Sequence, residues 1–299
     1  MKDSEIKKYD GSSNFLNYCN ASHTSIDRSA KKTIIVDGCS MIGTMFPIGS
    51  SSNSKRERAD IGAQFSEKWD FNRISLNMPG KSNCSIFRDT TNFLLYNYKK
   101  FNLSYENLFL IIEWSGLARY SYFNREKMGW EIYHLIVSDT ESGKMELHPG
   151  KNLDYHSIIE EHMNRFLYQI SVANLCENLG VNYIMYNGCD DIASYQAIDE
   201  HPTELAARIK EYFKYKESDT TIYDDFDNLY EVLLTKNFLD IPCTGYFGYE
   251  TGRYKKDKDR LKKYTYDGLH MNKLGHQEWR KILEDFIIEK GMGDFINDR

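Results

Sequence analysis

The sequence lacks the patterns that mark disulfide-rich, zinc-binding or membrane-spanning proteins. Its 299 residues include 6 cysteines, which are scattered without a Cys-x-x-Cys pair or a matching spacing to histidine. This scatter argues against a zinc site and against a disulfide framework. No apolar run reaches the length of a signal peptide or a membrane span, so we expect a cytoplasmic protein with no membrane partner.

Cofactor motifs and an excess of one charge are also missing. There is no Walker loop and no dinucleotide-binding glycine pattern. The histidines before residue 270 lack the compact spacing of a metal ligand set. We therefore expect neither a cofactor nor a metal. With 38 Lys and Arg against 44 Asp and Glu, the net charge of −6 gives no reason to expect nucleic acid as a partner. The oligomeric state is not indicated.

The chain has enough apolar residues for one globular domain, since 41% of it is hydrophobic. Residues 1–30 are polar and without a sustained period, which predicts a tail. We expect the domain to cover residues 31–290, with insertions at about 120–150 and 190–264, and a short tail at 291–299.

Short β-branched runs alternate with segments of helical periodicity. Strands are expected at 33–36, 71–77, 108–112 and 181–186. Helices are expected at 61–69, 83–100, 157–179 and 272–289. A hairpin is expected at 130–147. Further helical pieces are expected near 204–216 and 225–235. This alternation predicts an α/β fold in which helices cover both faces of a mainly parallel sheet.

Four polar segments either follow a predicted strand or precede the last helix, namely 37–43, 77–83, 113–119 and 267–276. In an open α/β sheet, loops at the carboxyl ends of the strands meet in one crevice. Ser40 would present its hydroxyl there, and Asp267 and His270 have the spacing of an orienting carboxylate and a base. Gly80 has no side chain, so its N–H can approach an oxyanion. Together these residues predict a serine hydrolase.

These segments resemble the SGNH (GDSL-type) hydrolase superfamily, in a Gly-Cys-Ser branch with a Trp-Ser-x-x-x-Arg block that is often seen in phage genomes. The resemblance implies a three-layer α/β/α sandwich of flavodoxin-like topology. It implies Ser40 as nucleophile, with Asp267 and His270 completing the triad, and the N–H groups of Ser40 and Gly80 in the oxyanion hole. It further implies an esterase that removes an O-acyl group from a carbohydrate, the small-molecule or glycan ester being its partner.

The chain departs from the family pattern in its third block. Where an oxyanion Asn is common, the sequence has Trp114 and Ser115. The third oxyanion donor is therefore open between Ser115, which we favour, Asn83 and Asn187. Arg119 is a candidate for binding an anionic substrate group or for a surface ion pair, and Trp114 and Asn83 are further candidates for substrate binding.

Alternative interpretations of these residues remain at this stage. Cys39 is a rival nucleophile, although its side chain should point away from that of Ser40. His276 is expected to pack in the core, because His270 has the better spacing from Asp267. A non-catalytic protein of the same fold, binding glycans or serving in assembly, is the alternative function, and a phage-encoded chain would allow virion association.

Overall fold

The computed structural model describes residues 32–39, 42, 61–77, 81–116, 119–124, 129–134, 136–138, 145–147, 155–188, 221–248, 257–265 and 270–297. For 97, 100, 119–124, 129–134, 136–138, 145–147, 155–162 and 221–227 it describes the backbone only. The predicted tail at 1–30 and the predicted helical piece at 204–216 lie outside the described residues.

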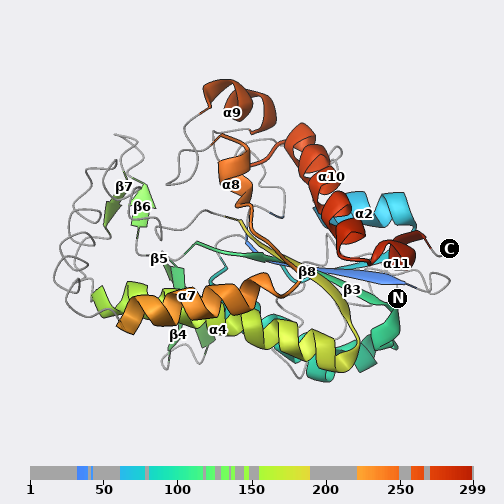
Figure 1. Cartoon of the computed structure of the whole chain (residues 1–299), viewed down its shortest axis with the longest axis horizontal. Coiled ribbons are helices and arrows are strands. Elements are labelled where there is room, and N and C mark those ends of the chain that lie inside the picture. The colour runs from blue at the N-terminus through green and yellow to red at the C-terminus, as the bar shows by residue number, and fades with distance from the viewer. Residues whose placement is uncertain are drawn as a thin grey trace.

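A parallel sheet forms the centre of the described fold (Figure 1). Its five strands are β1 (Thr33–Asp37), β2 (Asn72–Ser75), β3 (Leu108–Trp114), β8 (Asn182–Asn187) and β9 (Phe238–Leu239). They lie in the order β2-β1-β3-β8-β9, and each neighbouring pair is parallel. The predicted α/β fold with a mainly parallel sheet is confirmed. β9 was not predicted, because two residues are too short to show a periodicity.

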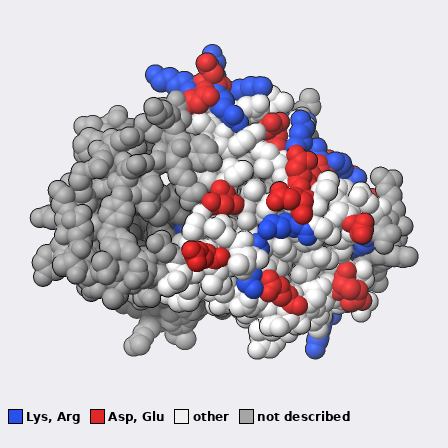
Figure 2. Space-filling model, viewed as in Figure 1, with Lys and Arg blue, Asp and Glu red and all other residues white. Residues whose placement is uncertain are grey.

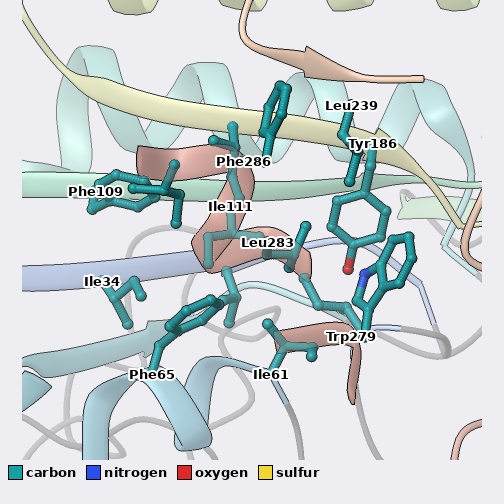
Figure 3. Close-up of a cluster of buried hydrophobic side chains, with 14 of the residues drawn as sticks. Ile34, Ile61, Phe65, Phe109, Ile111, Tyr186, Leu239, Trp279, Leu283 and Phe286 are labelled. Atoms are coloured by element: carbon teal, nitrogen blue, oxygen red, sulfur yellow. The ribbon is translucent and has the colours of Figure 1, made fainter. Parts of the chain in front are cut away.

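Alternate residues of each strand enter two separate hydrophobic clusters. Along β1, Ile35 belongs to one cluster, while Ile34 and Val36 belong to the other. The same alternation continues along β3, where Leu110 and Ile111 point to opposite faces. Both faces of these strands are thus buried, which explains why they read in the sequence as continuous apolar runs. Figure 3 shows the second cluster, in which Phe65 and Trp279 pack onto the sheet.

Helices cover both faces, as the three-layer prediction requires. The first cluster is completed by α3 (Asn83–Asn92), α4 (Tyr155–Leu179) and α7 (Thr221–Leu234). The second is completed by α2 (Ile61–Trp69), α10 (Lys273–Glu289) and α11 (Gly293–Asn297). The short helices α8 (Cys243–Tyr246) and α9 (Lys258–Tyr264) follow β9.

The structure also differs from the predicted elements after α3 and in the first insertion. The helix expected to reach about 100 is α-helical only to Asn92, and then continues as a π turn, η3 (Phe93–Asn97), and a 3-10 turn, η4 (Tyr98–Phe101). In the first insertion, β6 (Ile136–Ser138) and β7 (Met145–Leu147) form the predicted hairpin. A separate hairpin of β4 (Arg119–Asn124) and β5 (Gly129–His134) was missed.

The C-terminal segment that was expected to be a tail contains α11 and contributes to the core. The ring of Phe295 lies 5.8 Å from that of Phe71 and 5.6 Å from that of Phe109. Lys32, immediately before β1, donates from Nζ to the carbonyl of Phe295 at 2.6 Å. The last helix therefore closes the layer that α2 and α10 form.

Candidate active site

The strand order reverses between β1 and β3, because β2 adds to one side of β1 and β3 adds to the other. In open α/β sheets, ligands bind outside the carboxyl ends of the strands at such a switch point. Asp37 and Cys39 leave the sheet at the end of β1, and Ser115 leaves it at the end of β3. The topology therefore indicates the carboxyl end of β1, which the residues around Cys39 follow, as the expected ligand-binding position.

Cys39 is turned into the protein interior. Its side chain is fully buried, and Sγ lies 2.7 Å from Oε1 of Glu113, to which the thiol donates. A buried thiol held in this way is poorly placed to attack a substrate, which disfavours Cys39 as the rival nucleophile. Burial, together with the charge of Glu113, raises the pKa of Tyr186 well above its usual value, so the neighbouring phenol is neutral.

A continuous line of contacts leads from Glu113 toward His270. A Cβ on Gly188 would lie 2.6 Å from Oε1 of Glu113, so the carboxylate occupies the space beside this glycine. The carbonyl of Gly188 accepts from the N–H of Thr244 at 3.1 Å. Next to Thr244, Sγ of Cys243 lies 3.6 Å from Sδ of Met271. The residue before Ser40 and the residue after His270 thus belong to one edge of the sheet.

The backbone on both sides of the segment 266–270 is fixed. Thr265 and Met271 form an isolated antiparallel bridge. Asn272 then caps α10, since its Oδ1 accepts from the N–H of Gly275 at 3.0 Å. A Cβ on Gly275 would lie 2.3 Å from the carbonyl oxygen of Tyr264, so only glycine permits this close approach. His270, which is partly exposed, directly precedes the bridged residue Met271.

Asn83 links the start of α3 to the end of β3. Its Oδ1 accepts from the backbone N–H of Ser115 at 2.8 Å, and both residues are fully buried. This bond determines the orientation of the amide, because the oxygen must face the N–H. Among the described residues, Nδ2 of Asn83 has no hydrogen-bond partner. It lies in the first turn of α3, whose N-cap Ser82 accepts from Ser85 N.

A second buried polar group at this edge was not foreseen from the sequence. Lys81 is fully buried and contacts the carboxylates of Asp37 and Asp89. Desolvation by burial raises the pKa of Asp37 to about 6, although Lys81 acts to lower it. Burial alone would lower the pKa of Lys81, but the two carboxylates raise it above its usual value, so the amine is charged.

The remaining predicted residues are placed to different extents. Ser40, Gly80 and Asp267 lie outside the described residues, and for Arg119 only the backbone, at the start of β4, is described. The indole of Trp114 is fully buried in the cluster with α3 and α4. This gives it a packing role, and we do not count it as a substrate contact.

Two other polar side chains, Asn187 and His276, have their partners or their burial defined by the structure. Asn187 accepts from Nε2 of Gln169 at 3.0 Å, which orients its amide toward α4. His276 is fully buried in α10, as expected of a core histidine.

The surface of the described residues carries both signs of charge. Figure 2 shows Lys and Arg intermixed with Asp and Glu over the described part of this face. In α9, for example, Arg260 lies over the ring of Tyr246, and Asp257 caps the helix. None of the helices in the described ranges combines the length and the apolar character that crossing a membrane would require.

Comparisons with known proteins give no family for the chain. No protein-family model and no curated protein sequence matches it. Among solved structures, it is similar to the acetyl xylan esterase Est2A from Butyrivibrio proteoclasticus, with 10% identity and a TM-score of 0.39, covering 87% of this chain and 64% of that one. Protein YXIM from Bacillus subtilis has 13% identity and a TM-score of 0.42, covering 88% and 58% respectively.

A third similar structure is a mutant of Axe2, an acetyl-xylooligosaccharide esterase from Geobacillus, with 10% identity, a TM-score of 0.39 and coverage of 86% and 94%. The chain thus spans less than two thirds of the first two structures.

Proposed function

We propose that the protein is a serine esterase of the SGNH type that hydrolyses an ester through an acyl-Ser40 intermediate. The observation that supports the proposal is the line of contacts described above, which joins Cys39, next to Ser40, to Met271, next to His270. A nucleophile and a base that are far apart in the sequence need such a connection. The reversal of strand order at β1 and β3 supports the same location.

The proposed reaction uses each residue in one role. The Ser40 hydroxyl attacks the carbonyl carbon of the ester while His270 takes its proton. The C–O bond to the alcohol breaks, and His270 returns the proton to the departing oxygen. A water molecule, activated by the same imidazole, then cleaves the acyl-enzyme and regenerates Ser40. Asp267 holds the imidazole in the required tautomer throughout.

The oxyanion of each tetrahedral intermediate is assigned to the N–H groups of Ser40 and Gly80, with the amide of Asn83 as the third donor. Ser115 was the favoured third donor on sequence grounds. The bond from the Ser115 N–H to Oδ1 of Asn83 instead supports Asn83, because it leaves the Nδ2 donor directed elsewhere. The position of Asn83 in the first turn of α3 adds the positive end of the helix dipole.

The resemblance of the sequence motifs to SGNH hydrolases supports an O-acyl group on a carbohydrate as the substrate. We include Arg119 as the residue that binds an anionic group on such a substrate, since it follows Ser115 at the start of β4. Release of acetate from O-acetylated oligosaccharides tests this choice of substrate. Arg119→Gln should raise KM for anionic substrates and leave kcat for neutral substrates unchanged.

Hydrolysis of p-nitrophenyl acetate, with labelling by a fluorophosphonate probe, tests the reaction itself. Ser40→Ala and His270→Ala should each abolish turnover, and mass spectrometry should map the adduct to Ser40. Ser104→Ala is the control, because Ser104 precedes β3 at the opposite edge of the sheet. An adduct on Cys39 would overturn the assignment of Ser40 as the nucleophile. Glycan binding without turnover that survives both changes would favour the non-catalytic alternative.

A further inference from the structure

The side chain of Lys81 joins three segments that are separate in the sequence. Its Nζ lies 2.5 Å from Oδ1 of Asp37, at the end of β1, and 2.9 Å from Oδ2 of Asp89 in α3. It also donates to the carbonyl of Leu76, just after β2, at 3.0 Å. Two of these contacts are hydrogen bonds, to Asp37 and to Leu76, and the contact with Asp89 is an ion pair. The three contacts come from three different elements of the fold.

The two carboxylates are themselves held by further bonds. Asp37 accepts from the N–H of Gly38 at 2.7 Å through Oδ1, and from the hydroxyl of Thr90 at 2.8 Å through Oδ2. Asp89 pairs through Oδ1 with Nε of Arg88 at 3.2 Å. The two carboxylates thus face two cations, so the group is balanced in charge. Each partner has a defined direction as well as a defined distance.

Stability alone does not account for this arrangement. Removing two carboxylates and an ammonium group from water is costly, and well-packed apolar side chains of similar size often stabilise a protein as much or more. Hydrogen-bonded ion pairs differ from apolar contacts in fixing the direction and register of the chain segments that carry them. A fixed register is of most value where backbone N–H groups must point at one atom.

The sequence places the two proposed catalytic loops beside this network. Lys81 directly follows Gly80, and Asp37 precedes Gly38, Cys39 and Ser40. We propose that Lys81 is a positioning residue, which holds the Gly80 loop in register with the Ser40 loop through Asp37 and Asp89. This inference rests on the proposed esterase function. In this role Lys81 acts through its neighbour Gly80, by setting where the Gly80 N–H lies, and not on the substrate itself.

The test compares wild type, Lys81→Met and Lys81→Arg in p-nitrophenyl acetate hydrolysis and in the rate of fluorophosphonate labelling. A misplacement of about 1 Å can lower a rate by about 100-fold. We therefore expect Lys81→Met to lower kcat and the labelling rate by about that factor, with KM changed less than about threefold. Lys81→Arg, which keeps a cation and several donors, should recover part of the loss.

Two further variants separate positioning from stability. Lys236→Met makes the same change at the opposite edge of the sheet, where Lys236 pairs with Glu177 at 2.8 Å, and it should leave kcat unchanged. The triple variant Asp37→Asn, Lys81→Met, Asp89→Asn removes the three buried charges together and leaves only the partly exposed Arg88. It should therefore fold more stably than Lys81→Met, which leaves two buried carboxylates without their lysine. Positioning predicts that its kcat stays low although its Tm recovers.

The outcomes distinguish the inference from the function on which it rests. A folded Lys81→Met or triple variant with kcat and labelling within about threefold of wild type would overturn the positioning role while the esterase assignment stands. A wild-type protein that shows neither turnover nor labelling would overturn both. A fall in kcat that follows only the folded fraction, as measured by circular dichroism, would also overturn the positioning role.

Discussion

The backbone N–H of Ser115 donates to Oδ1 of Asn83 at 2.8 Å, which joins the end of β3 to the first turn of α3. Because the peptide N–H is the donor, the contact survives most substitutions of the Ser115 side chain. The amide of Asn83 cannot be replaced in the same way.

Substitution of Asn83 should therefore lower the rate much more than substitution of Ser115. Loss of one oxyanion donor lowers kcat by about 10²- to 10³-fold, and we expect this of Asn83→Ala. Asn83→Asp should lower it at least as far, since a carboxylate would repel the developing negative charge. Ser115→Ala keeps the N–H and should have a smaller effect. Steady-state kinetics on one ester substrate gives the comparison, and a larger loss for Ser115→Ala would restore Ser115 as the third donor.

The stability of the protein should depend on the protonation of Asp37. Desolvation by burial raises its pKa to about 6, so the folded state holds this proton more tightly than the unfolded state, for which the ordinary value is 3.8. The resulting stabilisation is complete below about pH 4 and is lost as the pH rises through about 6, a change of about 3 kcal/mol.

Urea unfolding of wild type and Asp37→Asn across this pH range measures the effect of Asp37. The free energy of unfolding of wild type minus that of the variant should fall by about 3 kcal/mol between about pH 4 and pH 7. Parallel pH profiles would show that Asp37 titrates alike in both states.

Gly275→Ala should destabilise the protein because the added Cβ would lie 2.3 Å from the carbonyl oxygen of Tyr264. Overpacking against backbone costs about 1–3 kcal/mol, and the shift would also disturb the loop that ends at His270. Gly293→Ala is the matched control, since its nearest neighbour would be Cγ1 of Ile288 at 3.8 Å. That variant should be neutral or more stable by about 0.5 kcal/mol. Equal effects in chemical unfolding would contradict this account.

The thiol of Cys39 should resist alkylation in the folded protein. It is fully buried against Glu113, whereas Cys84 in α3 is partly exposed. Brief treatment with iodoacetamide followed by peptide mapping should therefore modify Cys84 and leave Cys39 intact, and both should react in urea. Rapid modification of Cys39 in the native state would reopen its candidacy as the nucleophile.

The fold was predicted well where burial imposes a clear periodicity. The β-branched run in β1 and the apolar run in β3 identified the central strands, and Gly180, in a left-handed conformation with φ of 70°, ends α4 as expected. β9 has only Phe238 and Leu239, and its place depends on pairing with β8, which no local pattern encodes. The change from α to π geometry after Asn92 was likewise not indicated by the helical periodicity of this segment.

The site was predicted less completely, because its polar contacts join distant segments. A lysine is ordinarily an exposed residue, so nothing near Lys81 in the sequence indicates that it is buried between Asp37 and Asp89. Glu113 was predicted only as a polar residue at the end of a strand, whereas its carboxylate accepts a hydrogen bond from the thiol of Cys39. The predicted roles of Ser40, Gly80 and Asp267 stay predictions.

The helix α11 determines how far the chain can be shortened. Phe295 rests against Phe71 and Phe109, and Lys32 reaches its carbonyl from the start of β1. Removal of the chain after α10 would expose the rings of Phe71 and Phe109 and would remove the carbonyl that accepts from Lys32. A shortened protein would therefore expose part of its second hydrophobic cluster to solvent and would be prone to aggregate through that surface.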